Sequence, residues 1–231
     1  MKFVKYAGMS ALLLLGNMSQ LQATPYSVTG SFENAGFSDP YSLSYLFNND
    51  PVDRAEFGWG VNLDTLASSR FQFDGGNGDV VLPLDSPLLI NLGSFTYTNL
   101  ETVLVGEMVN VDLVLTVDVT DSWQADFRYG LQVNNVDNTA SSNDSMQVVN
   151  MPENLFFNAE GVDYELAMLG FSADSGDSFA TTFDLAEGAV LNMGIYAQLD
   201  RRISAVPLPS AVWLFGSAMI GLAGISRRSR K

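Results

Sequence analysis

Clusters of aspartate, asparagine and glycine are the parts of this sequence best suited to chemistry. One cluster runs from Asp74 to Asp79, a second from Asn134 to Asn138, and a third is the pair Asn143 and Asp144. Calcium takes six to eight oxygen ligands, which carboxylates and side-chain amides in loops supply. The candidate calcium ligands are Asp74, Asn77 and Asp79, or residues of the 134–144 segment.

The same clusters also have the composition of ordinary turns. Asp-Gly and Asn-Asn sequences favour turns because glycine tolerates positive φ and asparagine side chains bond to their own backbone. The first cluster does not match the EF-hand loop, since Gly76 and Gly78 occupy positions that require a carboxylate or an amide. A calcium site and simple turns are therefore both open interpretations.

Catalysis is constrained by the residue types that the chain lacks. It contains no histidine and no cysteine, which excludes Ser-His and Cys-His nucleophiles and the commonest metal ligand. A glycosidase needs only two carboxylates at a suitable separation, and the 26 acidic residues offer many pairs without singling one out. The sequence predicts that the chain is not an enzyme.

Charge is distributed unevenly along the chain. Residues 6–226 hold all 26 acidic residues but only five of the 11 basic ones, a net charge of −21. Such a surface repels phosphate backbones and anionic lipid headgroups. We therefore expect no nucleic-acid partner, and we expect cations or neutral ligands such as polysaccharides to suit this body better.

Strand-like alternation dominates the middle of the chain. Apolar residues occupy every second position from Val111 to Val119 and again from Ala125 to Val133, with a hairpin turn expected at Asp121-Ser122. The polar segment 34–56 is expected to be a surface loop or an N-terminal arm. Further strand-like runs occupy residues 26–32, 57–63, 70–73, 88–97, 164–171, 179–183 and 189–199.

These runs predict one all-β domain over residues 24–205, an antiparallel β-sandwich or jelly roll. The domain is expected to be flanked by an N-terminal signal helix and a C-terminal transmembrane helix.

The N-terminal segment has the three parts of a secretory signal peptide. Lys2 and Lys5 precede an apolar stretch, and a polar segment ends at Ala23. We expect a signal peptidase to cut between Ala23 and Thr24, so that residues 1–23 are removed. A buried N-terminal helix is the alternative.

The C-terminal segment has the features of a membrane anchor. Residues 206–226 carry no charge over about the length needed to cross a bilayer, and Arg227, Arg228, Arg230 and Lys231 follow. By the positive-inside rule the basic end stays cytoplasmic, which places residues 24–205 on the outer side. The N-terminal signal predicts the same topology.

The tail also resembles a known sorting signal. Val206-Pro207-Leu208-Pro209, the apolar Trp213-Leu214-Phe215 and the pair Arg227 and Arg228 are similar to the PEP-CTERM signal, in a variant with leucine where glutamate is usual. The resemblance implies that an exosortase, a membrane enzyme, cleaves the chain near these prolines and passes the body to the cell surface or to the extracellular matrix of an exopolysaccharide biofilm. An anchor that is never cut is the alternative.

The body resembles choice-of-anchor K domains and the related THxN family over about residues 57–200. The resemblance lies in Gly58-Trp59-Gly60, residues 92–99 and residues 164–171, with Tyr97 where THxN has histidine. These families imply an extracellular β-domain without an assigned activity. Trp59 and Phe95 are expected in the core, because half-buried strands recruit aromatic residues.

The predicted function is therefore a structural or adhesive component of a cell surface or matrix. The protein is expected to be exported across the inner membrane, to be membrane-anchored before processing, and to lie at the cell surface or in the extracellular matrix after it. A carbohydrate-binding module, with or without calcium, is the alternative. It requires aromatic rings on one exposed surface beside polar loops. The rings available for it are Trp59, Tyr97, Trp123 and Tyr129.

Overall fold

The computed structural model describes the body of the chain. The described residues are 22–37, 46–50 (backbone only), 54–62, 64–82, 84–102, 108–119, 123–136, 143–159 and 161–202. Most of the predicted signal peptide and the whole predicted sorting tail, including Val206, Pro207, Leu208, Pro209, Arg227 and Arg228, lie outside them. Within the described part no helix is long and apolar enough to cross a membrane.

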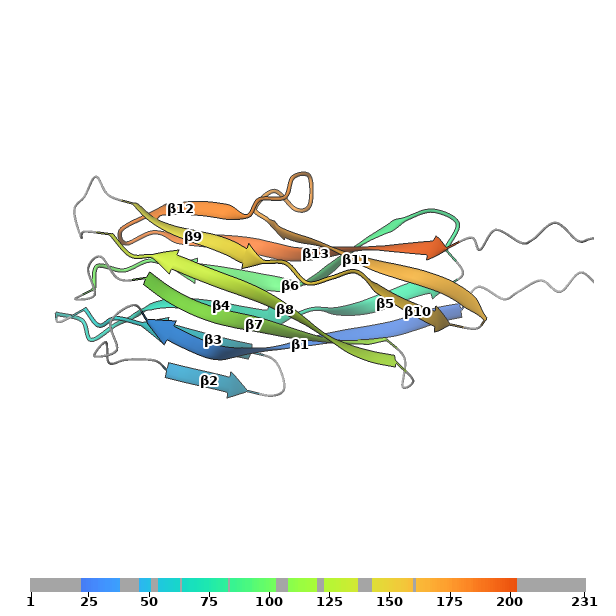
Figure 1. Ribbon diagram of the computed structural model, residues 1–231, viewed down its shortest axis with the longest axis horizontal. Coiled ribbons are helices and arrows are strands. Elements are labelled where there is room, and N and C mark those ends of the chain that lie inside the picture. Colours follow the sequence, from blue (N-terminus) through green and yellow to red (C-terminus); the bar gives the residue numbers. More distant parts are fainter. Residues whose placement is uncertain are drawn as a thin grey trace, which may run out of the picture.

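The described residues form thirteen strands and no helix, which confirms the all-β prediction (Figure 1). The strands are β1 (Gln22–Phe37), β2 (Leu46–Asp50), β3 (Arg54–Trp59), β4 (Ser69–Gly75), β5 (Asn77–Leu82), β6 (Leu88–Thr98), β7 (Met108–Val119), β8 (Trp123–Asn134), β9 (Asn143–Asn150), β10 (Leu155–Ala159), β11 (Val162–Ser172), β12 (Thr182–Ala186) and β13 (Val190–Arg202).

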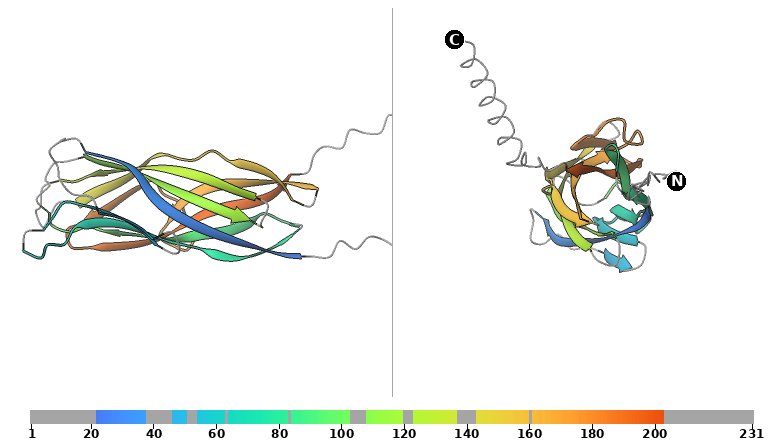
Figure 2. Two further views of the ribbon diagram at one scale, coloured as in Figure 1. Left: turned by 90° about the horizontal axis from the view of Figure 1, so that it is seen from below. Right: turned by 90° about the vertical axis from the view of Figure 1, so that its right-hand side faces the viewer.

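The strands make two antiparallel sheets that curl around one core (Figure 2). One sheet has the order β12-β9-β8-β7-β1-β5, and the other has the order β10-β11-β13-β6-β4-β3-β2. Sequence neighbours β7 and β8 pair directly, from Met108 with Asn134 to Val119 with Trp123. This pairing confirms the predicted hairpin, although its turn residues lie outside the described part.

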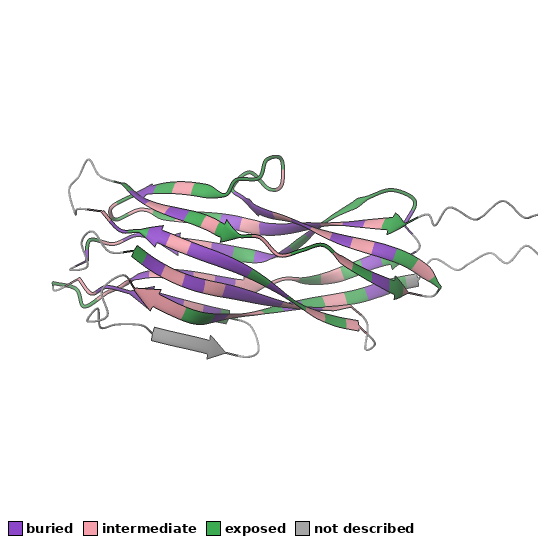
Figure 3. Cartoon of the chain, viewed as in Figure 1, coloured by how far each residue is buried: buried purple, intermediate pink, exposed green. Residues whose placement is uncertain are grey.

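Alternation of burial along the strands matches the alternation of the sequence (Figure 3). In β8, Phe127, Tyr129 and Leu131 are buried, whereas Asp126 and Arg128, on either side of Phe127, are exposed. Successive side chains of a strand point to opposite faces, so one face of β8 packs on the core and the other meets water. The buried faces of both sheets contribute to a single apolar cluster.

The chain passes from one sheet to the other at Gly75 and Gly76. Strand β4 pairs with β3 and β6 in one sheet, and β5 pairs with β1 in the other. Between them, Val28 N–H donates to Gly76 O (2.8 Å) and Gly76 N–H donates to Leu92 O (2.9 Å). These two bonds tie the crossing point to both sheets at once.

Two segments differ from their predicted structure. Segment 34–56 was expected to be a loop or arm, but it contains the end of β1, all of β2 and the start of β3. Segment 74–79 is extended strand rather than loop, apart from Gly76. Pairing with β1 and β3 outweighs the turn-forming composition of both segments, because the sheets satisfy their backbone hydrogen bonds.

Both chain ends of the body emerge at the same end of the molecule (Figures 1 and 2). We call this the proximal end; it holds the start of β1 and the end of β13. The opposite, distal end holds the ends of β6 and β8 and the starts of β9 and β13 (Figure 1). Ala23 and Thr24 pair with Val81 and Val80 at the proximal end, so cleavage between them would remove only the first two residues of β1.

Candidate functional site

The first predicted calcium set is not brought together. Arg54 Nε lies 2.9 Å from Asp74 Oδ1, and Gln72 Nε2 donates to Asp74 Oδ2 at 2.7 Å, so both carboxylate oxygens of Asp74 have partners. Strands advance by about 3.3 Å per residue, which separates Asp74 from Asp79 by roughly 16 Å of nearly extended chain. Asp74, Asn77 and Asp79 therefore do not surround one ion.

The four rings considered for carbohydrate binding do not form an exposed platform. Trp59, Tyr97 and Tyr129 are fully buried in the core. Trp123 is half-buried and stacks on Phe157, with ring centroids 4.5 Å apart. Trp59 and the fully buried Phe95 are core aromatics, as predicted.

A buried polar cluster lies at the distal end. We call it the distal cluster and define it by Tyr97, Asn99, Asp144 and Glu187. Tyr97 belongs to β6, Asn99 follows that strand, Asp144 belongs to β9, and Glu187 lies in the turn between β12 and β13. Tyr97, Asn99 and Asp144 have no exposed surface, which is unusual for an aspartate.

Backbone pairing brings these separate segments together. Leu185 of β12 pairs with Asp144 of β9, and Asn99 Nδ2 donates to Leu185 O at 3.0 Å. Gly188 N–H donates to Asn99 O, and Asn99 N–H donates to Ala189 O, both at 3.0 Å. Asn99 thus fastens the Glu187 turn beside the start of β9.

Asp144 is a buried carboxylate with one oxygen satisfied. Val136 N–H donates to its Oδ1 at 2.9 Å, whereas Oδ2 is covered and has no hydrogen-bond partner in the described structure. Burial raises the pKa of Asp144 above its ordinary value, against the opposing effect of the Val136 N–H and the Asn99 side chain. Burial of a charge costs free energy unless partners replace its water.

Glu187 adds a second carboxylate to the cluster. Both of its oxygens are covered and lack a hydrogen-bond partner among the described residues. Burial raises the pKa of Glu187, and the negative charges of Asp144 and Glu101 raise it further. The pKa of the Tyr97 phenol is also raised, first by burial and then by Asp144 and Glu187.

No positively charged side chain forms an ion pair with these two carboxylates in the described part of the chain. The ion pairs found there join Arg54 to Asp74, Arg128 to Glu33 and Asp112, and Arg202 to Glu165. None involves the distal cluster. The cluster is thus a set of oxygen acceptors with net charge −2 when both carboxyl groups are ionised.

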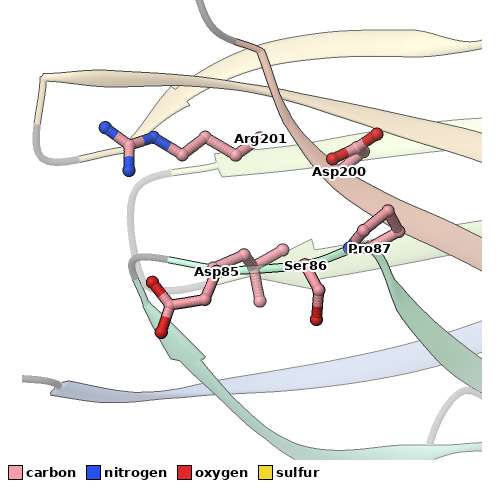
Figure 4. A pocket seen from close by; sticks show the side chains of 6 residues that line it. Asp85, Ser86, Pro87, Asp200 and Arg201 are labelled. Carbon is pink, nitrogen blue, oxygen red and sulfur yellow. The ribbon is translucent and has the colours of Figure 1, made fainter.

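Two surface hollows are also present. The first, about 180 Å³ at the proximal end, is lined by Leu84, Asp85, Ser86, Pro87, Asp200 and Arg201. Figure 4 shows the Asp85 and Asp200 carboxylates pointing away from each other. The second, about 190 Å³ near the distal end, is lined by Met108, Gln132, Asn134, Ser145 and Gln147. It contains no carboxylate and no aromatic ring.

Sequence reasoning found only part of the distal cluster. Asp144 was a candidate within the 134–144 segment, and the backbone of Val136 in the same segment does contact it. Asn99 and Glu187 were missed. Asn99 follows a largely apolar strand and Glu187 stands in an Ala-Glu-Gly turn, so neither belongs to one of the clusters of aspartate, asparagine and glycine that the sequence singled out.

Comparisons with known proteins add no assignment. No family model matches the chain, and no curated protein matches it.

One exposed turn gives a pH-dependent prediction. Asp174 Oδ1 accepts hydrogen bonds from Ser172 Oγ (2.6 Å) and Ser178 N–H (2.9 Å), and Oδ2 accepts one from Ser178 Oγ (2.5 Å). These bonds, first that of Ser172, lower the pKa of Asp174 to about 2. Because the folded pKa lies below the ordinary 3.8, the carboxylate stabilises the turn fully above about pH 4, and this contribution is lost as pH falls through about 2.

We therefore expect the Asp174 carboxyl carbon to titrate near pH 2 in an NMR titration. Amide exchange at Ser178 should accelerate over the same range. Asp174→Asn should already show faster exchange of the Ser178 amide at pH 7, because the asparagine Nδ2 cannot accept a hydrogen bond from the Ser178 hydroxyl. A titration midpoint near 4 would contradict the bonding described here.

Proposed function

We propose that this chain is an exported structural or adhesive protein of a cell surface or extracellular matrix. The order of segments is the observation that carries the proposal: a signal-like start, an acidic all-β body, and an uncharged stretch that begins Val-Pro-Leu-Pro and ends in basic residues. A signal peptidase and an exosortase-type enzyme are the proposed processing partners. The body, which we class as one β-sandwich domain, is proposed to have no catalytic activity.

The arrangement of the body supports this proposal. Its two ends emerge together at the proximal end (Figure 2), so a tail following β13 would leave the distal end directed away from the membrane. The distal end then faces the surroundings, where a surface or matrix component meets its partners. The acidic exterior keeps such a body solvated and disfavours contact with anionic lipid.

The sorting tail can be tested by fractionation. We expect Pro207→Ala combined with Pro209→Ala to leave the protein in the membrane fraction, because an exosortase would no longer recognise its site. In the unaltered chain, the surface fraction should contain a species that begins at Thr24 and lacks the apolar tail, as measured by intact mass. Removal of Arg227, Arg228, Arg230 and Lys231 should instead weaken membrane retention, since no cytoplasmic charge would hold the helix.

Pro87→Ala is the matched control, because Pro87 is an exposed proline of the body. It should be processed like the unaltered chain. An uncut anchor predicts that the double proline variant changes nothing. Full-length protein in the membrane for both the unaltered chain and the proline variant would refute the sorting proposal.

A glycan array tests the alternative of a carbohydrate-binding module. The full chain, purified in detergent, should bind no glycan if its role is structural. Three of the four rings that such a module needs are buried, which is why the structural role is preferred. Saturable binding to one glycan class would replace the structural proposal with a binding module.

A further inference from the structure

The distal cluster holds covered oxygen atoms that lack a donor. They are Asn99 Oδ1, Asp144 Oδ2 and both carboxylate oxygens of Glu187, none of which has a hydrogen-bond partner in the described structure. The Tyr97 hydroxyl is covered and without a partner as well. Buried polar groups in folded proteins are nearly always satisfied, so a group of such atoms in one place indicates a missing partner.

A positively charged partner would both satisfy these oxygens and neutralise the two carboxylates. Asp144 pairs with Leu185, two residues before Glu187, and Asn99 bonds to both Leu185 O and Gly188 N–H, so the segments that carry the two carboxylates meet at one asparagine. Leaving both ionised without a counter-charge in a covered position is unfavourable. Hydrogen-bond donors from water would satisfy the oxygens but would leave the two negative charges unneutralised.

We propose that the distal cluster binds a divalent cation of the calcium type, with Asp144, Glu187 and Asn99 as side-chain ligands. A Ca²⁺ ion would neutralise the two carboxylates and accept the Asn99 carbonyl oxygen, with the Tyr97 oxygen beside it. Calcium prefers carboxylate and amide oxygens in irregular geometry, whereas magnesium keeps most of its water. Zinc prefers nitrogen and sulfur ligands, and this chain has neither histidine nor cysteine.

The local structure suits this role. Asn99 is held by three hydrogen bonds through its backbone and its Nδ2, which leaves Oδ1 as its remaining acceptor. Val136 N–H fixes the Asp144 carboxylate through Oδ1. Oδ2 has no hydrogen bond of acceptable geometry in the described structure, although the nearby Asn99 side chain acts to lower the pKa of Asp144, so Oδ2 is open to a ligand. Glu187 lies in a turn, so its side chain completes a site that Asp144 of β9 and the hydrogen-bonded Asn99 begin. The proposal goes beyond the surface role and does not depend on the export route.

Calcium should stabilise the protein by binding the folded state. Oxygen sites of extracellular modules have dissociation constants of about 10⁻⁴ to 10⁻³ M. For a body of this size, 10 mM calcium should therefore raise the Tm of the EDTA-treated full chain in detergent by about 3–10 °C. Magnesium at 10 mM should raise it much less. Tb³⁺ should show luminescence excited through Tyr97 and Trp59, whose ring centroids are 6.0 Å apart, and calcium should displace it.

Two variants separate cation binding from a structural role. Asp144→Asn keeps an Oδ1 acceptor for Val136 N–H but removes the charge, and Glu187→Gln removes the second charge. Both should lose the calcium-induced rise in Tm and at least tenfold of the Tb³⁺ affinity. In EDTA, both should melt at or above the unaltered chain, because a costly buried charge has been removed. The expected result is thus that each variant melts at or above the unaltered chain in EDTA but below it in calcium.

Asp79→Asn is the matched control, since Asp79 is an exposed aspartate of the set that sequence alone favoured. It should respond to calcium like the unaltered chain. If Asp144→Asn does not fold, Glu187→Gln carries the test, because its turn is half-exposed.

Three results would overturn the proposal. The first is an unaltered chain with no Tm shift and no Tb³⁺ signal, which would mean that the two carboxyl groups share a proton. The second is an equal response to magnesium and calcium. The third is Tb³⁺ binding that survives both substitutions.

Discussion

Replacing Phe71 by alanine is expected to lower the free energy of unfolding by about 3–5 kcal/mol, the range for truncating a buried phenylalanine. Phe71 has no exposed surface and lies in β4 at the centre of an aromatic cluster. Its ring centroid is 4.8 Å from that of Trp59, 5.1 Å from that of Phe95 and 5.2 Å from that of Tyr97. Rings packed on several sides cannot collapse into the space that truncation leaves, so the cavity persists.

Urea unfolding of the full chain, followed by tryptophan fluorescence, measures this loss. Phe156→Ala is the matched control, because the Phe156 ring is 53 % exposed and lies under the Arg202 guanidinium at 4.6 Å. It should cost about 1 kcal/mol or less. Similar losses for the two variants would show that the aromatic cluster does not carry the stability of the body.

The fold class was readable from sequence because strand alternation is a local property. Val111, Leu113, Leu115 and Val117 occupy every second position, and β7 buries these same residues. The short strands β9 and β10 escaped notice. Strand β9 begins with three polar residues, Asn143 to Ser145, which give no apolar alternation. Asp144 among them is nevertheless fully buried. Its burial is set by neighbouring strands, which a local pattern does not contain.

The candidate cation site was predicted in part for the same reason. Aspartate and asparagine clusters in the sequence singled out Asp144 and also Asp74, Asn77 and Asp79. Asp74, Asn77 and Asp79 do not come together around one point, because an extended strand keeps them apart. Asp144 instead meets Asn99 and Glu187, which depends on the pairing of β12 with β9 and on the hydrogen bond from Gly188 to Asn99. Alternation identifies strands but does not say which strands become neighbours.

Replacing Gly75 by alanine is expected to destabilise the body by about 3 kcal/mol or more, at the upper end for an added group in a packed interior. An added Cβ would lie 1.8 Å from Val28 O and 2.9 Å from Val28 C. Both are backbone atoms of β1, so no side-chain rotation relieves the clash. Relief would require β1 to move, although Val28 N–H is bonded to Gly76 O at 2.8 Å and Val28 pairs with Val117 of β7.

Gly36→Ala provides the matched control, because Gly36 lies in the same strand β1 and an added Cβ there meets no described atom within 4 Å apart from those of its chain neighbours. Alanine at this position should change stability by about 0.5 kcal/mol or less, or raise it slightly, because glycine has more conformational freedom to lose on folding. Urea midpoints compare the two variants directly. If both variants unfold at the same midpoint, β1 can shift at no cost, and the crossing at Gly75 does not lock the two sheets together. A urea midpoint lowered only in Gly75→Ala means that the close backbone contact between Gly75 and Val28 holds β1 of one sheet against β4 of the other.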